Sequence, residues 1–442
     1  MKRVVLPLSI LVFIAGCGGN DAPSPEAAGP DMPPVVQETS PVPPPGAGAT
    51  AFTGAGIWDG TGTAVQYGVA LIVRDGRVEG IVDAIPEGAQ VVDLAGQFIT
   101  PGFINTHGHV SGRWAGDEVR DIAGRIRGDL ELYARYGITS ILSLGGIPDE
   151  GIGIRDAQND PSLRHARLHL AGAVVAGDTP EQASAIALAN IEKGVDWIKI
   201  RIDDNLGTAT KMPWGAVQVA INAAKASDVP AATHIFYMAD AERALQMGSG
   251  LIAHSVRDRT VTDEFVQMML DTGVCYVPTL VREVSTFVYA ERPDWFDDPF
   301  FLEAANRREM QRVTQPDFQA QVRSSPTADG YRKALVQAQD NLRILIGSGV
   351  PVAFGTDSGP AGRFPGYFEH LEFGLMADAG LTPREILLSA TSVAADCLSL
   401  DDVGTLEPGK WADFIAYTAN PVADIAAART IQQVYVAGNA IR

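Results

Sequence analysis

The chain has 442 residues, 46% of them hydrophobic, which is enough for one large folded domain with a smaller one beside it. Its 34 basic and 53 acidic residues give a formal net charge of −19 at pH 7. This excess of acid argues against nucleic acid as a partner, because phosphate binding needs clustered lysines and arginines, and it slightly disfavours polyanionic substrates.

Residues 1–16 have the features of a bacterial lipoprotein signal peptide. A basic start precedes an apolar run over 4–15 that is too short to span a membrane comfortably. The run ends at Ile14-Ala15-Gly16-Cys17, which resembles a lipobox, so we expect cleavage before Cys17 and lipid on that cysteine. Gly18 then indicates an outer-membrane anchor that faces the periplasm. The alternative is a signal peptide cut elsewhere, with Cys17 incidental.

Residues 17–48 are predicted to be a disordered tether. They are rich in proline, as in Pro41-Val42-Pro43-Pro44-Pro45-Gly46, and cannot bury enough apolar area to offset their ordering entropy. Beyond Cys17, the chain holds only Cys275 and Cys397, which are too few for a disulfide framework. Whether these two cysteines pair stays open.

Both ends of the folded part are expected to be β-structure. Short strand signals run from 52 to 94, where Asp75-Gly76 is a good hairpin turn, and no helix is predicted there. The C-terminal residues repeat this pattern, with strands predicted at 412–417 and 431–436. We therefore expect residues 49–96 and 401–442 to form one small β-sandwich.

The middle of the chain, residues 97–400, alternates short apolar runs with helical stretches. Helices are predicted at 179–193, 238–247 and 262–271, and the long polar interval 281–347 is predicted to be helical over the barrel mouth. Eight strands alternating with helices predict an α/β fold, a (β/α)8 TIM barrel. The predicted strands are 98–106, 138–144, 166–175, 196–202, 230–236, 250–256, 275–280 and 351–357.

Metal-ligand residue types recur at the predicted carboxyl ends of these strands, where barrel enzymes place their chemistry. The first strand ends with His107 and His109, whose side chains point to the same side and can reach one ion. Imidazole and carboxylate groups suit zinc and related ions. The other candidates are Lys199 in the fourth strand, His234 in the fifth, His254 in the sixth and Asp357 in the eighth.

These motifs resemble those of the amidohydrolase superfamily, and more closely its branch of imidazolonepropionases, metal-dependent dipeptidases and prolidases. The resemblance covers about 51–442 and includes 101–109, 196–200, 355–357 and the tail 404–413. It implies that one divalent ion is held by His107, His109 and Asp357, and a second by His234 and His254, with zinc as the expected metal. It also implies that Lys199 is N6-carboxylated and bridges both ions.

The resemblance further implies hydrolysis of an amide C–N bond in a small peptide-like or N-acyl amino acid substrate. A hydroxide shared by the two ions would attack the carbonyl, with Asp357 as the proton shuttle. Two alternatives stay open: a mononuclear cyclic amidase or lactonase at the same site, and a non-catalytic, metal-free surface binder. Lys199 could instead bind a substrate anion or face outward, and Asp357 could be a turn or helix-cap residue.

Two weaker substrate-binding candidates follow the fifth and sixth strands. Tyr237 can hydrogen-bond a substrate carbonyl or oxyanion, or simply pack. Arg257 can clamp a carboxylate, although an ion pair with Asp258 is the simpler expectation; Arg201 and Arg282 have the same status. The remaining histidines, His165, His169 and His370, are expected to be structural or to lie outside the catalytic group.

Overall fold

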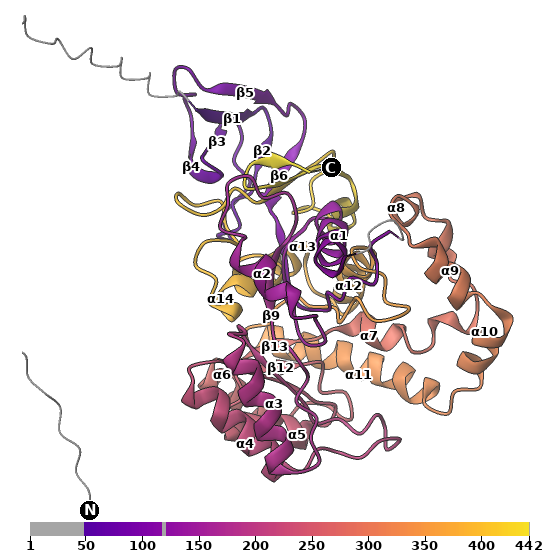
Figure 1. The fold of residues 1–442 in the computed structure, drawn as a ribbon. Coiled ribbons are helices and arrows are strands. Elements are labelled where there is room, and N and C mark those ends of the chain that lie inside the picture. The colour runs from indigo at the N-terminus through magenta and orange to yellow at the C-terminus, as the bar shows by residue number, and fades with distance from the viewer. Residues whose placement is uncertain (1–47, 117–120, 442) are drawn as a thin grey trace, which may run out of the picture. The chain divides into compact units, whose positions relative to one another are not determined.

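The computed structural model describes residues 48–116 and 121–441 (Figure 1). The predicted signal peptide, Cys17 and residues 17–47 of the predicted tether lie outside the described residues. Among the described residues, no helix is long and apolar enough to cross a membrane.

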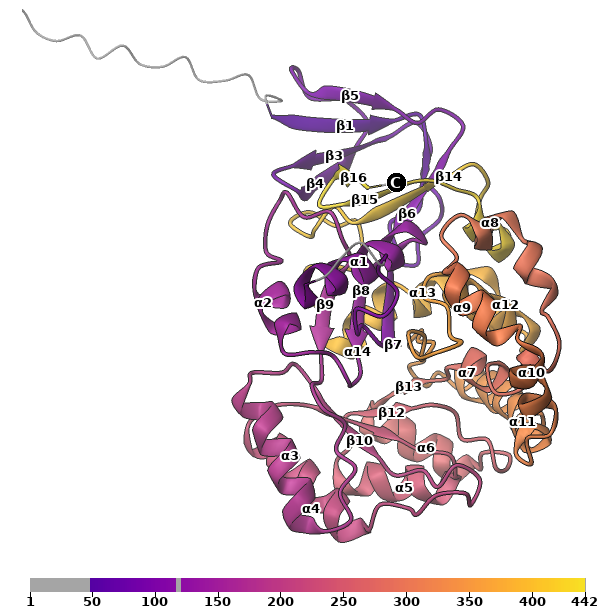
Figure 2. The same ribbon diagram turned by 45° about the vertical axis from the view of Figure 1, so that its right-hand side comes forward.

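Strands from the two ends of the chain lie side by side (Figures 1 and 2). A four-stranded sheet has the order β4-β3-β1-β5, and a five-stranded sheet has the order β16-β15-β14-β6-β2. The first contains β1 (Ala49–Thr53), β3 (Ala70–Arg74), β4 (Arg77–Val82) and β5 (Gln90–Asp93). The second contains β2 (Gly56–Ile57), β6 (Phe98–Pro101), β14 (Phe414–Tyr417), β15 (Ile431–Val436) and β16 (Asn439–Ala440).

The strands predicted at both ends are present, and they share one hydrophobic cluster. The ring of Phe52 in β1 lies 4.9 Å from that of Phe414 in β14 and 5.0 Å from that of Tyr435 in β15. The predicted turn between β3 and β4 is confirmed, since Asp75 and Gly76 both have the positive φ of a tight hairpin.

Two parallel sheets occupy the middle of the chain. β7 (Phe103–Gly108), β8 (Ile138–Ser143) and β9 (Arg167–Leu170) form one of them. The other contains β10 (Ile198–Arg201), β11 (Ala231–His234), β12 (Leu251–Ala253) and β13 (Cys275–Val277). Isolated parallel bridges join Val175 to Ile200, Tyr276 to Val352 and Gly108 to Ser358. The predicted mixed α/β fold is therefore confirmed.

Two strand predictions differ from the structure. The predicted strand 98–106 is two strands, because β6 pairs with β14 while β7 pairs with β8. They are separated at Gly102, where any Cβ would collide with the side chain of Thr139. The predicted run 351–357 forms no named strand among the described residues, although Ala353 N donates to Tyr276 O and Thr106 N donates to Phe354 O, both at 2.9 Å.

The predicted helices are present and begin and end where their caps require. The segments predicted at 179–193, 238–247 and 262–271 are α3 (Pro180–Glu192), α5 (Met238–Met247) and α6 (Asp263–Thr272). The side chains of Thr179 and Thr262 cap α3 and α6, as helix starts favour. The other helices before β13 are α1 (Ile122–Arg135), α2 (Glu150–Asp156) and α4 (Trp214–Ala226).

The interval after β13 is helical, as predicted. It holds α7 (Leu280–Val284), α8 (Pro299–Leu302), α9 (Arg307–Val313), α10 (Pro316–Arg323) and α11 (Ala328–Gly347), with 3-10 turns at Val288–Ala290 and Asp294–Asp297. Three more helices follow before β14: α12 (Tyr367–Asp378), α13 (Pro383–Ser389) and α14 (Ser392–Leu398). A last 3-10 turn, Ile425–Arg429, precedes β15.

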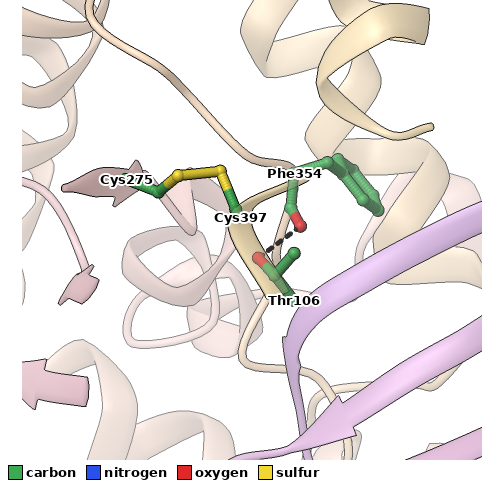
Figure 3. Close-up of a disulfide and its surroundings, with 4 residues drawn as sticks. All are labelled: Thr106, Cys275, Phe354 and Cys397. Carbon is green, nitrogen blue, oxygen red and sulfur yellow. Dashed lines mark hydrogen bonds between the residues drawn. A yellow bond between two sulfur atoms is a disulfide. The ribbon is translucent and has the colours of Figure 1, made fainter. Parts of the chain in front are cut away.

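The two cysteines whose pairing was left open form a disulfide. Cys275 begins β13, Cys397 lies in α14, and their Cα atoms are 5.8 Å apart (Figure 3). The bond joins residues 122 positions apart in the chain. Beside it, Thr106 Oγ1 donates to Phe354 O at 2.8 Å, so the disulfide lies near the junction of β7 with residues 351–357.

Replacing both cysteines by serine should lower the free energy of unfolding by about 4 kcal/mol, because a cross-link across so long a loop restricts the unfolded chain strongly. Urea unfolding of both forms measures the loss. Reduced wild-type protein, which keeps both sulfur atoms, is the control and should lose a similar amount. A loss below about 1 kcal/mol in both would contradict this role.

Candidate metal centre

The six residues predicted from the strand ends lie together in the structure. The ring centroid of His107 is 5.7 Å from that of His109 and 4.6 Å from that of His254. The rings of His254 and His234 are 4.0 Å apart. Lys199 Nζ lies 3.0 Å from His107 Nε2, and Asp357 Oδ1 lies 2.8 Å from His109 Nε2. We refer to these six residues as the histidine cluster.

Three members of the histidine cluster offer ligand atoms at a spacing that suits one ion. His107, His254 and Asp357 each place a nitrogen or oxygen within 4.8 Å of the others, and all three residues are buried. Asp357 Oδ1 is also 3.7 Å from His107 Nε2. Imidazole and carboxylate donors at this spacing fit a divalent transition-metal ion.

The hydrogen bonds of His109 show why the cluster fits a cation. Its Nδ1 lies 2.8 Å from Gly145 O, a carbonyl that can only accept, so Nδ1 carries the proton. In the neutral ring Nε2 is then an acceptor, yet it faces a carboxylate oxygen of Asp357 at 2.8 Å. Two acceptors in contact need a proton or a metal ion between them. His254 is oriented in the same way, with Nδ1 2.7 Å from Thr279 Oγ1.

Burial keeps the imidazoles of His107, His234 and His254 neutral, which is the form that binds metals. Desolvation, with help from neighbouring positive groups, lowers the pKa of His107 and His254 well below the usual value. It lowers the pKa of His234 to about 3. Burial alone would raise the pKa of Asp357, but Arg363 and the hydrogen bond with His109 hold that pKa well below its usual range. The cluster therefore presents neutral nitrogens beside an ionised carboxylate.

Two residues that contact the histidine cluster were not predicted from the sequence. Arg363 Nη1 donates to Asp357 Oδ2 and, at 3.2 Å, to Asp357 O, while its Nε donates to Ser285 Oγ at 3.0 Å. Asp203 Oδ2 lies 3.0 Å from His234 Nε2 and is buried. Asp203 lies just past the end of β10, and this position at a strand end could have identified it as a site residue. Arg363 lies in a glycine-rich loop with no such signal.

Three residues at this site have a strained backbone. His254, Thr279 and Asp357 have φ values of 73°, 47° and 57°, in the left-handed region that residues with a Cβ seldom adopt. His254 and Thr279 come just after β12 and β13, Asp357 ends the run 351–357, and His254 contacts Thr279 directly. Such strain persists only where the surroundings fix it, and it concentrates at functional sites.

A buried carboxylate in α12 holds the chain on both sides of Asp357. Glu369 Oε1 accepts hydrogen bonds from Thr356 Oγ1 at 2.8 Å and Ser358 Oγ at 2.5 Å. It also accepts from Asn105 Nδ2 at 2.7 Å, two residues before His107. One side chain thus fixes the positions of two proposed ligands without touching either.

Replacing Glu369 by alanine should weaken metal affinity about 10- to 100-fold, because three hydrogen bonds that orient the ligand-bearing segments are lost. Glu369→Gln, which keeps an oxygen acceptor, should weaken it less. Competition with a metal chelator measures both affinities. If the alanine variant binds metal as tightly as the wild type, Glu369 has no positioning role.

The weaker candidates for substrate binding lie outside the histidine cluster. Tyr237 is half-buried; its hydroxyl donates to Asp204 Oδ1 at 3.0 Å, and Lys211 Nζ lies 4.1 Å from its ring centroid. Its role in substrate binding stays a prediction. His370 is buried in α12 with Nε2 2.9 Å from Tyr136 O, and His165 Nδ1 lies 2.9 Å from Ala166 O. These contacts agree with the expected structural roles.

The expected ion pair between Arg257 and Asp258 is wrong. Arg257 is buried, with Nε 3.1 Å from Glu283 Oε1, while Asp258 pairs with Arg259 at 2.8 Å. Glu283 also holds Arg282 at 3.1 Å. The guanidinium turns inward because Ile235 O and Ser255 O accept from its Nη1, at 3.0 and 2.6 Å.

The chain is similar to known proteins over most of its length. The amidohydrolase family model matches residues 98–441. Imidazolonepropionase from Deinococcus deserti is 24% identical over 398 residues, which cover 84% of this chain and 92% of that protein. A Xaa-Pro dipeptidase solved with methionine in its active site superposes with a TM-score of 0.69 at 21% identity, covering 89% of this chain and 99% of that one. A prolidase complexed with N-methylphosphonate-L-proline gives 0.69 at 20% identity, with the same coverage.

Proposed function

The chain belongs to the amidohydrolase family, and from this premise we propose that it is a binuclear metal-dependent hydrolase that cleaves an amide C–N bond of a small peptide-like or N-acyl amino acid substrate. His107, His109 and Asp357 would hold one divalent ion, expected to be zinc, and His234 and His254 a second. The facing acceptors of His109 and Asp357 support a cation at this place.

The position of Lys199 is the observation that carries the binuclear proposal. Its side chain is 3% exposed, and Nζ lies 3.0 Å from Nε2 of His107. An ammonium group there would repel a dication. Burial lowers the pKa of Lys199 to about 7, so the neutral amine that reacts with carbon dioxide is well populated near neutrality. The resulting carbamate would offer two oxygen ligands, one for each ion.

The bound ions would supply acidity, since a divalent metal lowers the pKa of water and polarises a carbonyl group. The residues of the chain would do the rest. The Asp357 carboxylate, which its contact with Arg363 keeps ionised, would take the proton of the attacking water and deliver it to the leaving nitrogen. Asp203 would hold His234 in its binding orientation, and Thr279 would do so for His254.

Two measurements together test the proposal: the number of metal ions per chain and a substrate screen. Elemental analysis should give near two divalent ions per chain, and the reconstituted protein should hydrolyse members of a dipeptide and N-acyl amino acid library. One ion with cleavage of a cyclic amide or lactone would favour the mononuclear alternative, which the likeness to imidazolonepropionase supports. No ion and no turnover would leave only a non-catalytic binder.

Two finer points of architecture belong to the same proposal. We infer that the parallel strands close into a (β/α)8 barrel, and three parallel bridges support this. Val175–Ile200 joins the chain after β9 to β10, while Tyr276–Val352 and Gly108–Ser358 join β13 and β7 through residues 351–358. We also infer that the two end sheets form one β-sandwich, supported by their shared cluster around Phe52 and Phe414.

We further propose that the protein is a cell-envelope lipoprotein, anchored to the outer membrane through Cys17 and facing the periplasm. The lipobox-like sequence supports the anchor. The disulfide between Cys275 and Cys397 supports an oxidising compartment, where such bonds persist. Labelling with a fatty acid tests this: the wild type should incorporate lipid and Cys17→Ser should not.

A further inference from the structure

A cavity lined by arginines lies apart from the histidine cluster. It has a volume of about 510 Å³ and is bounded by residues 113–116, helix α1 and the chain at 304–308. A second cavity of about 410 Å³ shares several of its lining residues, including Arg113 and Arg125. The charged residues that line the first cavity are Arg113, Arg125, Arg135, Arg307, Arg308 and Glu131.

The charge of this cavity is opposite to that of the chain. The formal net charge of the protein is −19, yet the described residues that line this cavity carry five guanidinium groups and one carboxylate. Like charges brought together by folding repel one another, and a cleft lined by one sign of charge concentrates counter-ions. The net negative charge of the whole chain disfavours polyanionic ligands, but the local positive charge of this cavity favours them.

The carboxylate of Glu309, near the cavity, does not neutralise Arg113. Arg113 Nη2 is 3.5 Å from Glu309 Oε2, but that carboxylate already accepts from Arg312 at 2.9 and 2.7 Å and from Gly362 N. Within residues 48–116 and 121–441, the side chains of Arg135 and Arg307 make no ion pair or hydrogen bond. Among the described residues, nothing therefore occupies their donors.

We propose that this arginine-lined cavity binds a small molecule that carries two or more anionic groups, as phosphates or carboxylates. Guanidinium groups match the paired oxygens of both and bind them bidentately. The volume suits a small ligand, since such sites measure roughly 300–1,000 Å³. The proposal is independent of the hydrolytic function, because none of the six residues of the histidine cluster lines the cavity.

The cavity wall is connected to the histidine cluster. Residues 111–115 continue from His109, and the buried Asp129 carboxylate accepts from four of their backbone N–H groups, those of Ser111, Gly112, Trp114 and Ala115. Trp114 Nε1 donates to Gly359 O at 2.6 Å, two residues after Asp357. These hydrogen bonds hold residues 111–115 in place between the histidine cluster and the cavity.

Titration calorimetry on the metal-loaded protein, with pyrophosphate and with citrate as probes, tests the proposal. The double variant R135A/R307A should bind the better probe at least about tenfold more weakly than the wild type. The variant R332A is the matched control, because Arg332 lies on α11 and pairs with Asp329 at 2.7 Å; it should bind as the wild type does. Rising salt should weaken binding.

Three outcomes would overturn the proposal. One is that neither probe binds the wild type at millimolar concentration. Another is that the double variant binds as tightly as the wild type. The third is that Asp357→Asn, with the cavity intact, abolishes binding, since the probe would then be sitting on the metal ions. Loss of amide hydrolysis alone would count against the proposed function and not against this site.

Discussion

Replacing Asp357 by asparagine should lower kcat/KM by at least about a thousandfold while the protein stays folded. The amide has nearly the same shape as the carboxylate, but it cannot accept a proton or offer a charged oxygen to a cation. Asp357 contacts His109 at 2.8 Å and also Arg363, so both its acidity and its position depend on the cluster. Steady-state kinetics on the best substrate of the screen, with metal content measured in parallel, would show the effect.

The control for this variant is Asp329→Asn, the same chemical change at a side chain that is 86% exposed. It should leave kcat/KM unchanged. Circular dichroism and thermal unfolding should show that Asp357→Asn keeps its secondary structure. Unchanged turnover in a folded Asp357→Asn protein would remove this residue from the mechanism.

Replacing Lys199 by alanine should remove metal and activity together. Nζ of Lys199 lies 3.0 Å from His107 Nε2 inside a buried cluster, so the variant loses the group proposed to bridge the two ions. We expect fewer than two ions per chain and a fall in kcat/KM of at least about a thousandfold. A short carboxylic acid added to the buffer should restore part of both, because it can occupy the place of the carbamate.

Lys193→Ala provides the control. Lys193 pairs with Asp149 on the surface and is the C-cap of α3, the helix that precedes the strand β10 with Lys199. It should keep full metal content and activity. Full metal occupancy in Lys199→Ala would show that Lys199 is no bridge, and the binuclear proposal would then lose its main support while the family assignment stands.

The ligand set could be found in the sequence because two regularities act together. Apolar runs mark the strands, and parallel strands present their carboxyl ends at one edge, so the residues that end each run meet. His107, His234 and His254 were placed in this way, and the structure brings them together. Helix caps such as Thr179 were equally visible, because a cap depends only on residues close in sequence.

Contacts that depend on distant segments could not be predicted. Arg363 reaches Asp357 because the loop after Ser358 turns back over it, and nothing near Arg363 in the sequence indicates that turn. Arg257 turns away from its neighbour Asp258 because the distant Glu283 and two carbonyl oxygens satisfy it better. The division into β6 and β7 likewise reflects distant partners, because β6 pairs with β14 and β7 pairs with β8.

The pairing of β6 with β14 also bears on how the protein is made. Ile99 and Thr100 meet Ala416 and Ile415, so β6 has no partner on this edge until β14, more than 300 residues later, has been synthesised. A nascent polypeptide would expose that edge throughout translation, where it invites aggregation. Versions truncated before residue 414 should therefore accumulate in inclusion bodies.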